Sequence, residues 1–170
     1  FIRPSIKYPA NTLIICSHCF ADNNHIGDSR KMLYETYYEW LDSTIKILNN
    51  EYNPTFKNYV IKVHPYIEIY KEKFLFNRII KKFSNWKNIN LKICKQNQNI
   101  SDLISEENIF PVFLTVHGQI CHELGTIGLP VIACGTAQGP LYNQYNPSSI
   151  EEYRKILKNN IYATECLERL

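Results

Sequence analysis

Five short apolar runs, separated by longer stretches of mixed polarity, organise the chain. They occupy residues 13–16, 59–63, 89–93, 112–116 and 131–134. The nearly continuous apolar run at 112–116 is typical of a parallel strand that is covered on both faces. The alternation in residues 89–93 is also typical of a strand. The pattern therefore predicts five strands.

The stretches between these runs carry apolar residues at helical spacing. Residues 32–49 and 67–83 show the repeat most clearly, and the second has many lysines on its outer face. We assign the aromatic residues of the first helix to the core. A short helix is expected at Ser101, another over residues 119–126, and a last one from Pro147, where a serine followed by acidic residues forms a capping-box pattern.

This alternation of strands and helices predicts an α/β fold, a Rossmann-like three-layer domain. One domain accounts for residues 1–170, with a parallel sheet of about five strands in the order 3-2-1-4-5 and right-handed crossovers. Residues 135–146 are predicted to be a long loop between the last strand and the last helix.

Three histidines follow three of the predicted strands. His18 comes after the first strand, His64 after the second and His117 after the fourth. In the predicted order the first and fourth strands are neighbours, and ligands bind such sheets outside the carboxyl ends of the strands at this reversal of strand order. We therefore expect the three histidines to converge on one ligand site.

The most specific segment is TVHGQICHELGTIGLPVIACG, residues 115–135, which predicts a strand, a tight turn, a short helix and a second strand. Gly118 allows the backbone to approach a ligand closely. The helix that begins at Gln119 directs its first N–H groups towards the end of the strand, and these groups form a natural seat for a phosphate.

This segment resembles the C-terminal, donor-binding half of GT-B glycosyltransferases, and most of all the transferases of bacterial capsule and surface-polysaccharide biosynthesis. Further similarity lies in SHCFAD at residues 17–22 with His25, in YYEWL at 37–41, in KVHP at 62–65 and in YNPSSIEEY at 145–153. Together these segments cover residues 13–158. The resemblance implies a domain of a longer enzyme, consistent with a chain that opens at Phe1 without a leader-like segment, and an additional N-terminal acceptor domain.

The resemblance also implies roles for individual residues in binding a nucleotide-activated donor. His64 is expected to contact the phosphate or nucleotide, where an imidazole can stabilise the charge of the departing group. Glu123 is expected to accept hydrogen bonds from the ribose hydroxyls. Backbone groups complete the expected donor site, at His117, Gly118 and Gln119 for the phosphate and at Gly135 and Thr136 for the base or sugar.

The loop after the first strand is a candidate for acceptor chemistry. His18, Asp22 and His25 lie around it, and an Asp–His pair could position an acceptor hydroxyl or act as its base. A loop with ordinary polar surface residues explains the same sequence equally well. Lys62 is expected to lie within its strand, and a phosphate contact by its side chain is the less favoured interpretation.

Composition and charge narrow the class of protein. A hydrophobic content of 45% and an aromatic content of 13% indicate a globular protein. A net charge of +3, spread along helical segments, is too small for a nucleic-acid-binding protein. No run is long enough to span a bilayer. We expect a cytoplasmic protein whose mild positive charge also suits peripheral association with the inner face of a membrane, although solvated helix faces explain that charge as well.

The six cysteines do not form a metal-binding pattern. Cys16, His18 and Cys19 resemble part of a zinc site, but no second ligand pair completes it. We interpret the cysteines as reduced, and expect neither a metal nor a cofactor.

The expected partners are therefore a nucleotide-sugar donor of the CMP, CDP or UDP type, or a CDP-polyol, and a glycan or lipid-linked acceptor. Two alternatives remain open at this point. One is an enzyme similar to UDP-sugar 2-epimerases, which share the fold but need more carboxylates than this chain offers. The other is a non-catalytic module that binds nucleotide sugars or assists assembly.

Overall fold

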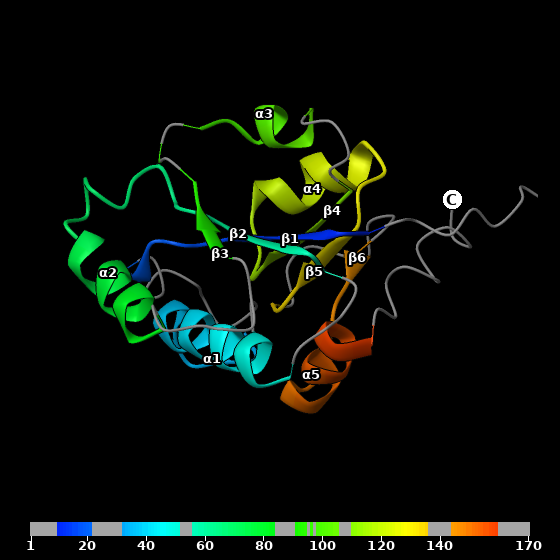
Figure 1. Cartoon of the computed structure of the whole chain (residues 1–170), viewed down its shortest axis with the longest axis horizontal. Helices are drawn as coiled ribbons and strands as arrows, with labels where there is room; N and C mark the ends of the chain where they lie inside the picture. The colour runs from blue at the N-terminus through cyan, green and yellow to red at the C-terminus, as the bar shows by residue number, and fades with distance from the viewer. Residues whose placement is uncertain are drawn as a thin grey trace, which may run out of the picture.

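The computed structural model describes residues 10–21, 32–51, 56–83, 91–94, 96, 98–105, 110–135 and 144–159. These residues form three layers, with a parallel sheet between two layers of helices (Figure 1). Helices α3 and α4 lie on one face of the sheet, and α1, α2 and α5 lie on the other. The α/β, Rossmann-like architecture predicted from the sequence is confirmed.

The sheet has six strands in the order β3-β2-β1-β4-β5-β6, and every neighbouring pair is parallel. The strands are β1 (Thr12–Cys16), β2 (Asn58–Lys62), β3 (Leu91–Ile93), β4 (Pro111–Thr115), β5 (Val131–Ala133) and β6 (Gln144–Tyr145). The five predicted strands and their order are confirmed. The sixth strand, β6, lies inside the predicted loop of residues 135–146. It was not predicted, because a two-residue strand is too short to produce a recognisable pattern of apolar residues.

The helices are α1 (Tyr37–Asn50), α2 (Lys73–Lys82), α3 (Ile100–Ile104), α4 (Gln119–Thr126) and α5 (Ile150–Asn159). Three predicted helix starts are wrong. The first helix begins at Tyr37 and not at residue 32, since the Thr36 side chain accepts a hydrogen bond from Glu39 N–H and caps it there. The short third helix is capped by Asn99 and not by Ser101.

The start of α2 is also later than the predicted residue 67. Residues 65–71 form turns, and Lys71 has a φ of 58°, which a right-handed helix does not accommodate. Glu72 N–H donates to the Ile67 carbonyl at 2.9 Å and closes this turn. The segment after β2 is therefore a compact turn followed by a helix of ten residues.

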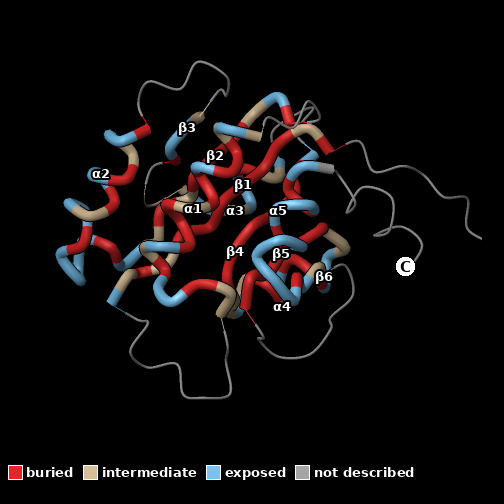
Figure 2. Tube along the Cα trace, turned by 90° about the horizontal axis from the view of Figure 1, so that it is seen from below, coloured by how far each residue is buried: buried red, intermediate tan, exposed pale blue. Residues whose placement is uncertain are grey.

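Alternate residues of the central strands pack into two separate hydrophobic cores, one on each face of the sheet. Leu13 and Ile15 face α1, α2 and α5, whereas Ile14 packs with Phe113 against α3 and α4. All four residues are fully or almost fully buried, and β1 and β4 are red along their length in Figure 2. Burial on both faces explains the continuous apolar runs, because each such side chain contributes about 1.5–3 kcal/mol by leaving water.

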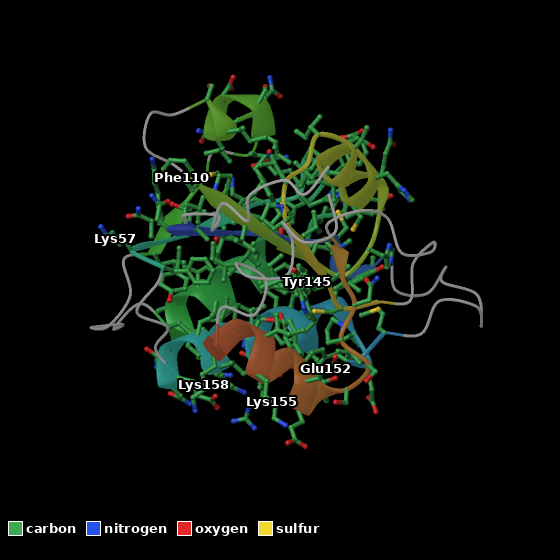
Figure 3. All side chains as sticks on the ribbon, turned by 90° about the vertical axis from the view of Figure 1, so that its right-hand side faces the viewer. Lys57, Phe110, Tyr145, Glu152, Lys155 and Lys158 are labelled. Atoms are coloured by element: carbon green, nitrogen blue, oxygen red, sulfur yellow. The ribbon has the colours of Figure 1, made fainter. Side chains whose placement is uncertain are left out.

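The amino-terminal edge of the sheet is fastened by Asn11. Its carbonyl accepts a hydrogen bond from Lys57 N–H at 2.8 Å, and its side-chain oxygen accepts one from Phe110 N–H at 3.0 Å. Lys57 and Phe110, labelled in Figure 3, directly precede β2 and β4. These bonds align the starts of three parallel strands, so that their carboxyl ends also meet at one edge.

The last helix closes the lower layer. Ser149 Oγ accepts a hydrogen bond from Glu152 N–H at 3.1 Å, as the capping-box pattern predicts, and Tyr153 joins α5 to α1 through a 2.7 Å hydrogen bond with Thr44. Lys155 and Lys158 project away from the sheet (Figure 3). The apolar face of α5 is thereby turned towards the core.

Candidate functional site

A pocket of about 560 Å³ opens at the carboxyl edge of the sheet, where β1 lies between β2 and β4. Its volume is in the range of small-molecule sites. Its lining comes from the ends of these strands and from the segments before α3 and α4: Cys16, Ser17, His18, Lys62, Val63, His64, Pro65, Gln96, Gln98, Asn99, Ile100, Thr115, His117, Gly118, Gln119, Ile120 and Glu123. The predicted convergence of His18, His64 and His117 is confirmed.

His18 lies deepest of the three histidines. Its Nε2 is 2.9 Å from Thr115 Oγ1 and accepts a hydrogen bond from Val116 N–H at 3.3 Å. Its ring stacks on Tyr37 with centroids 4.4 Å apart and lies 5.2 Å from the ring of His117. Burial, and to a lesser extent the neighbouring histidines, lowers the pKa of His18 to about 3. His18 is therefore neutral at physiological pH.

His64 joins the loops that follow β1 and β2. Its Nδ1 is 2.9 Å from Cys19 Sγ and accepts a hydrogen bond from Tyr66 N–H at 3.2 Å. Its own backbone N–H donates to Ser17 Oγ at 3.1 Å. The Cys19 side chain is completely buried. The imidazole is thus held at the lip of the pocket by contacts from both sides.

Tyr37 links His117 to the first helix. Its hydroxyl is hydrogen-bonded to His117 Nε2, although Tyr37 itself is buried in α1. Helical spacing assigned Tyr37 to the core, which is confirmed, but gave no sign of this polar contact. A buried tyrosine hydroxyl usually finds such a partner, and here that partner belongs to the pocket.

The turn into α4 presents backbone N–H groups to the pocket. Gly118 precedes the helix with a φ of 116° and has no side chain to cap it. A Cβ at Gly118 would have no atom within 4 Å, so the space in front of the turn is open. Gln119 and Ile120, which also line the pocket, carry first-turn N–H groups that lack intrahelical acceptors. This end of α4 bears a partial positive charge.

Lys62 brings a full positive charge to the same pocket. It is the last residue of β2, and its Nζ donates hydrogen bonds to the carbonyl oxygens of Gln96 at 3.1 Å and of Val63 at 3.4 Å. Within the described part of the chain it has no carboxylate partner. Among the described residues that line the pocket, Glu123, exposed on α4, is the one carboxylate. The pocket therefore combines positive charge with a carboxylate that can accept hydrogen bonds.

Glu72 anchors the loop after β1 and was not identified from the sequence. Its carboxylate oxygens accept hydrogen bonds from Phe20 N–H at 2.6 Å and from Ala21 N–H at 2.5 Å. Only 6% of the residue is exposed. Its partners lie more than fifty residues away in the sequence, so no local pattern could reveal it. Pocket residues Gln96, Gln98 and Asn99 were missed for the same reason.

Other expected site residues lie elsewhere or cannot be assessed. Gly135 is not part of the pocket lining, and a Cβ there would meet the Val116 carbonyl oxygen at 2.9 Å, so glycine is required for packing. Asp22, His25 and Thr136 fall outside the described residues.

The Cys16 thiol is protonated. Burial raises the pKa of Cys16 to about 12, with the Lys62 charge acting weakly in the opposite direction. None of the five cysteines of the described ranges forms a disulfide. Among these same residues, no group of three or more His, Cys, Asp or Glu side chains is arranged to hold a metal ion.

No helix in the described ranges has both the length and the apolar character needed to cross a bilayer. In comparisons with known proteins, no family model matches the chain and no curated protein resembles it significantly. The pocket itself is therefore the basis for assigning a function.

Proposed function

We propose that this chain is the donor-binding half of a GT-B-type glycosyltransferase, which binds a nucleotide-activated sugar or CDP-polyol for capsular or surface-polysaccharide synthesis. The observation that carries the proposal is the combination of an open, glycine-started helix terminus and the Lys62 ammonium group in one pocket at the reversal of strand order. This combination favours a phosphorylated ligand, because both groups stabilise negative charge there.

In this proposal the diphosphate or phosphate of the donor lies against Gly118, Gln119 and Lys62. The imidazoles of His64 and His117 donate further hydrogen bonds to its oxygens. These interactions become stronger as negative charge develops on the departing nucleotide, and this difference is what lowers the barrier to transfer. Glu123, further along α4, accepts hydrogen bonds from the ribose hydroxyls.

The acceptor half of the reaction belongs to other parts of the protein. An N-terminal domain would hold a glycan or lipid-linked acceptor, and Asp22 or His25 would assist its hydroxyl. A cytoplasmic protein that associates peripherally with the inner face of a membrane would meet a lipid-linked acceptor there.

A non-catalytic nucleotide-sugar-binding module is the second candidate. It is favoured by the presence of a single carboxylate, Glu123, among the described residues that line the pocket, because Glu123 is assigned to the ribose hydroxyls and leaves no further carboxylate among them to accept the proton of the acceptor. The same scarcity of carboxylates argues against an enzyme similar to UDP-sugar 2-epimerases.

The test is a binding panel of CMP, CDP, UDP, GDP and NAD, measured by calorimetry and by thermal unfolding. A nucleotide at about a hundred times its Kd should raise the free energy of unfolding by roughly 2.7 kcal/mol. Lys62→Gln should weaken binding about tenfold to a hundredfold, since a charge-assisted hydrogen bond contributes roughly 1.5–3 kcal/mol. Glu123→Gln should weaken nucleotide binding but leave the binding of inorganic pyrophosphate unchanged.

Lys158→Gln and Glu151→Gln are the matched controls, because both side chains are exposed on α5, outside the pocket lining. They should bind as the wild type does. The proposal fails if no nucleotide binds, or if Lys62→Gln and the wild type have equal affinities.

A further inference from the structure

We propose that the neutral rings of His64 and His18 present their N–H groups in opposite tautomers, and that the buried Cys19 thiol is a positioning residue which, together with Tyr66 N–H, favours the tautomer of His64. The tautomers follow from contacts in the free protein. Their use in recognising a phosphate oxygen rests on the proposed function.

The tautomer of His64 follows from the groups that meet its Nδ1. A backbone N–H can only donate, so the 3.2 Å contact from Tyr66 N–H requires a lone pair on Nδ1. The proton of the neutral ring is then on Nε2. The Cys19 thiol, 2.9 Å from the same Nδ1, acts as a second donor to that lone pair.

The same contacts exclude a thiolate–imidazolium pair. Such a pair would place a proton on Nδ1 of His64, pointing towards the N–H of Tyr66 and the sulfur of Cys19 at once. The Tyr66 contact would then become a repulsion between two donors. Cys19 therefore orients the ring as a neutral thiol, and it does not act as a nucleophile.

His18 has the opposite arrangement. Its Nε2 accepts the Val116 N–H at 3.3 Å and lies 2.9 Å from Thr115 Oγ1. The lone pair is on Nε2, and the ring proton is on Nδ1. The pKa of about 3 agrees with a ring that stays neutral. His18, which lines the pocket, thus donates from its Nδ1, whereas the Nδ1 of His64 is an acceptor.

Lys62 and the amino terminus of α4 supply positive charge to the pocket, and His18 and His117 line the same space as His64. Glu72, which directly precedes α2, uses its two carboxylate oxygens to accept the N–H groups of Phe20 and Ala21. The charge of a bound anion is therefore balanced by Lys62 and α4, while the imidazoles select oxygen atoms by hydrogen bonding.

Long-range ¹H–¹⁵N NMR of the unliganded chain tests this directly, with rings assigned from His64→Gln and His18→Gln. We expect a protonated-type Nε2 in His64 at about pH 8, a protonated-type Nδ1 in His18, and little change in the His18 ring from about pH 8 to about pH 6. Cys19→Ser should preserve the pattern. Cys19→Ala should weaken the tautomer preference of His64 about fivefold, which corresponds to the loss of one ordinary hydrogen bond.

A protonated Nδ1 in the neutral His64 ring, or a protonated Nε2 in the His18 ring, would overturn the tautomer assignment. An unchanged His64 in Cys19→Ala would remove Cys19 from it. If Cys19→Ala does not fold, Cys19→Val fills the same space without a donor and is read in the same way.

CDP affinity at about pH 8 supplies the functional arm, compared between the wild type and Cys19→Ala. We expect the variant to bind CDP more weakly, because the His64 ring is then less firmly oriented. Because the NMR experiment contains no nucleotide, a failure of CDP to bind would count against the proposed function and leave the tautomer result intact.

Discussion

At the scale of single residues, the pocket is built from polar groups whose hydrogen-bonding roles are fixed by the backbone. Val116 N–H and Tyr66 N–H each determine which nitrogen of a histidine accepts. Backbone donors cannot change their role as side-chain hydroxyls can, so the pattern presented to a ligand is set before binding. Such preorganisation lowers the cost of binding.

The buried neutral state of His18 makes stability depend on pH. Its folded pKa of about 3 lies below the ordinary 6.5, so the unfolded chain takes up a proton first as the pH falls below about 6.5, and stability is lost from there downwards. We expect His18 to account for about 1–2 kcal/mol of lost unfolding free energy between about pH 7 and about pH 5.

Urea denaturation at about pH 7 and about pH 5 measures this loss of unfolding free energy in the wild type and in His18→Gln. Glutamine is chosen because its side-chain oxygen can still accept the hydrogen bond from Val116 N–H. The variant should lose less stability on acidification. Equal losses in the two proteins would show that His18 does not titrate as the structure implies.

Replacing Gly118 and, as a control, Gly128 distinguishes the effect of backbone strain on stability from the effect of a new side chain on ligand binding. Gly118→Ala should cost about 1 kcal/mol of stability, because a φ of 116° is unfavourable for alanine even though its Cβ has free space. The methyl group would also stand in front of the α4 N–H groups and weaken nucleotide binding. Gly128→Ala, also at positive φ but outside the pocket lining, should lose stability without a loss of nucleotide affinity, as measured by calorimetry.

At the scale of elements, the loop after β1 is attached to the start of α2. Glu72→Gln should lower the free energy of unfolding by about 1–3 kcal/mol, because one of the two bonded backbone N–H groups would face an amide NH₂ in place of a carboxylate oxygen. The His18 and Cys19 segment should lose its position as well, with weaker nucleotide binding. Glu68→Gln is the control, because Glu68 is exposed and its ion pair with Lys73 contributes about 0–1 kcal/mol. Equal stability of the two variants would contradict the anchoring role of Glu72.

Some of the helices and strands could be predicted from the sequence, and others could not. The strands and their order could be predicted, since each is a buried apolar run and the connections follow a known handedness. The start of α2 could not, because it depends on the positive φ of Lys71 and on a turn closed by residues 67 and 72. Periodicity over residues 67–83 continues through that break and conceals it.

The residues of the candidate site that follow strand ends could be predicted from the sequence. The residues that depend on contacts between distant parts of the chain could not. The three histidines each follow a strand, and they converge as expected. Lys62 was assigned to its strand, which is correct, but side-chain alternation puts it on the same face as Val60, beyond the cover of the helices, so that its ammonium group reaches the pocket. Cys19 and Glu72 act across 45 to 52 residues, which a single sequence does not reveal.

At the scale of the whole molecule, an exposed apolar surface lies beside the pocket. Tyr66, Ile69, Tyr70 and Phe74 are between 48% and 71% exposed, and Tyr66 contacts the ring of His64. Residues 65–82 contain five basic and two acidic residues, so this segment alone carries a charge equal to the +3 of the entire chain. Aromatic and basic residues together are typical of surfaces that bind anionic membranes.

Co-sedimentation with vesicles tests this surface. We expect binding to phosphatidylcholine vesicles that contain phosphatidylglycerol and not to phosphatidylcholine alone, with a loss of about tenfold in Tyr70→Ser/Phe74→Ser. Ile127→Ser is the control, since Ile127 is 63% exposed outside this surface. Equal binding to both kinds of vesicle, or no effect of the double substitution, would contradict a membrane role and indicate a protein partner for these side chains.

The central position of β1 determines when the sheet can be completed during synthesis. Ile14 pairs with Val60 on one side and with Phe113 on the other. The second pairing joins residues about a hundred positions apart, and closing so long a loop is entropically costly and slow. Until β4 leaves the ribosome, one apolar edge of β1 has no partner. Nascent chains that end before residue 111 should therefore be the ones that most need a chaperone.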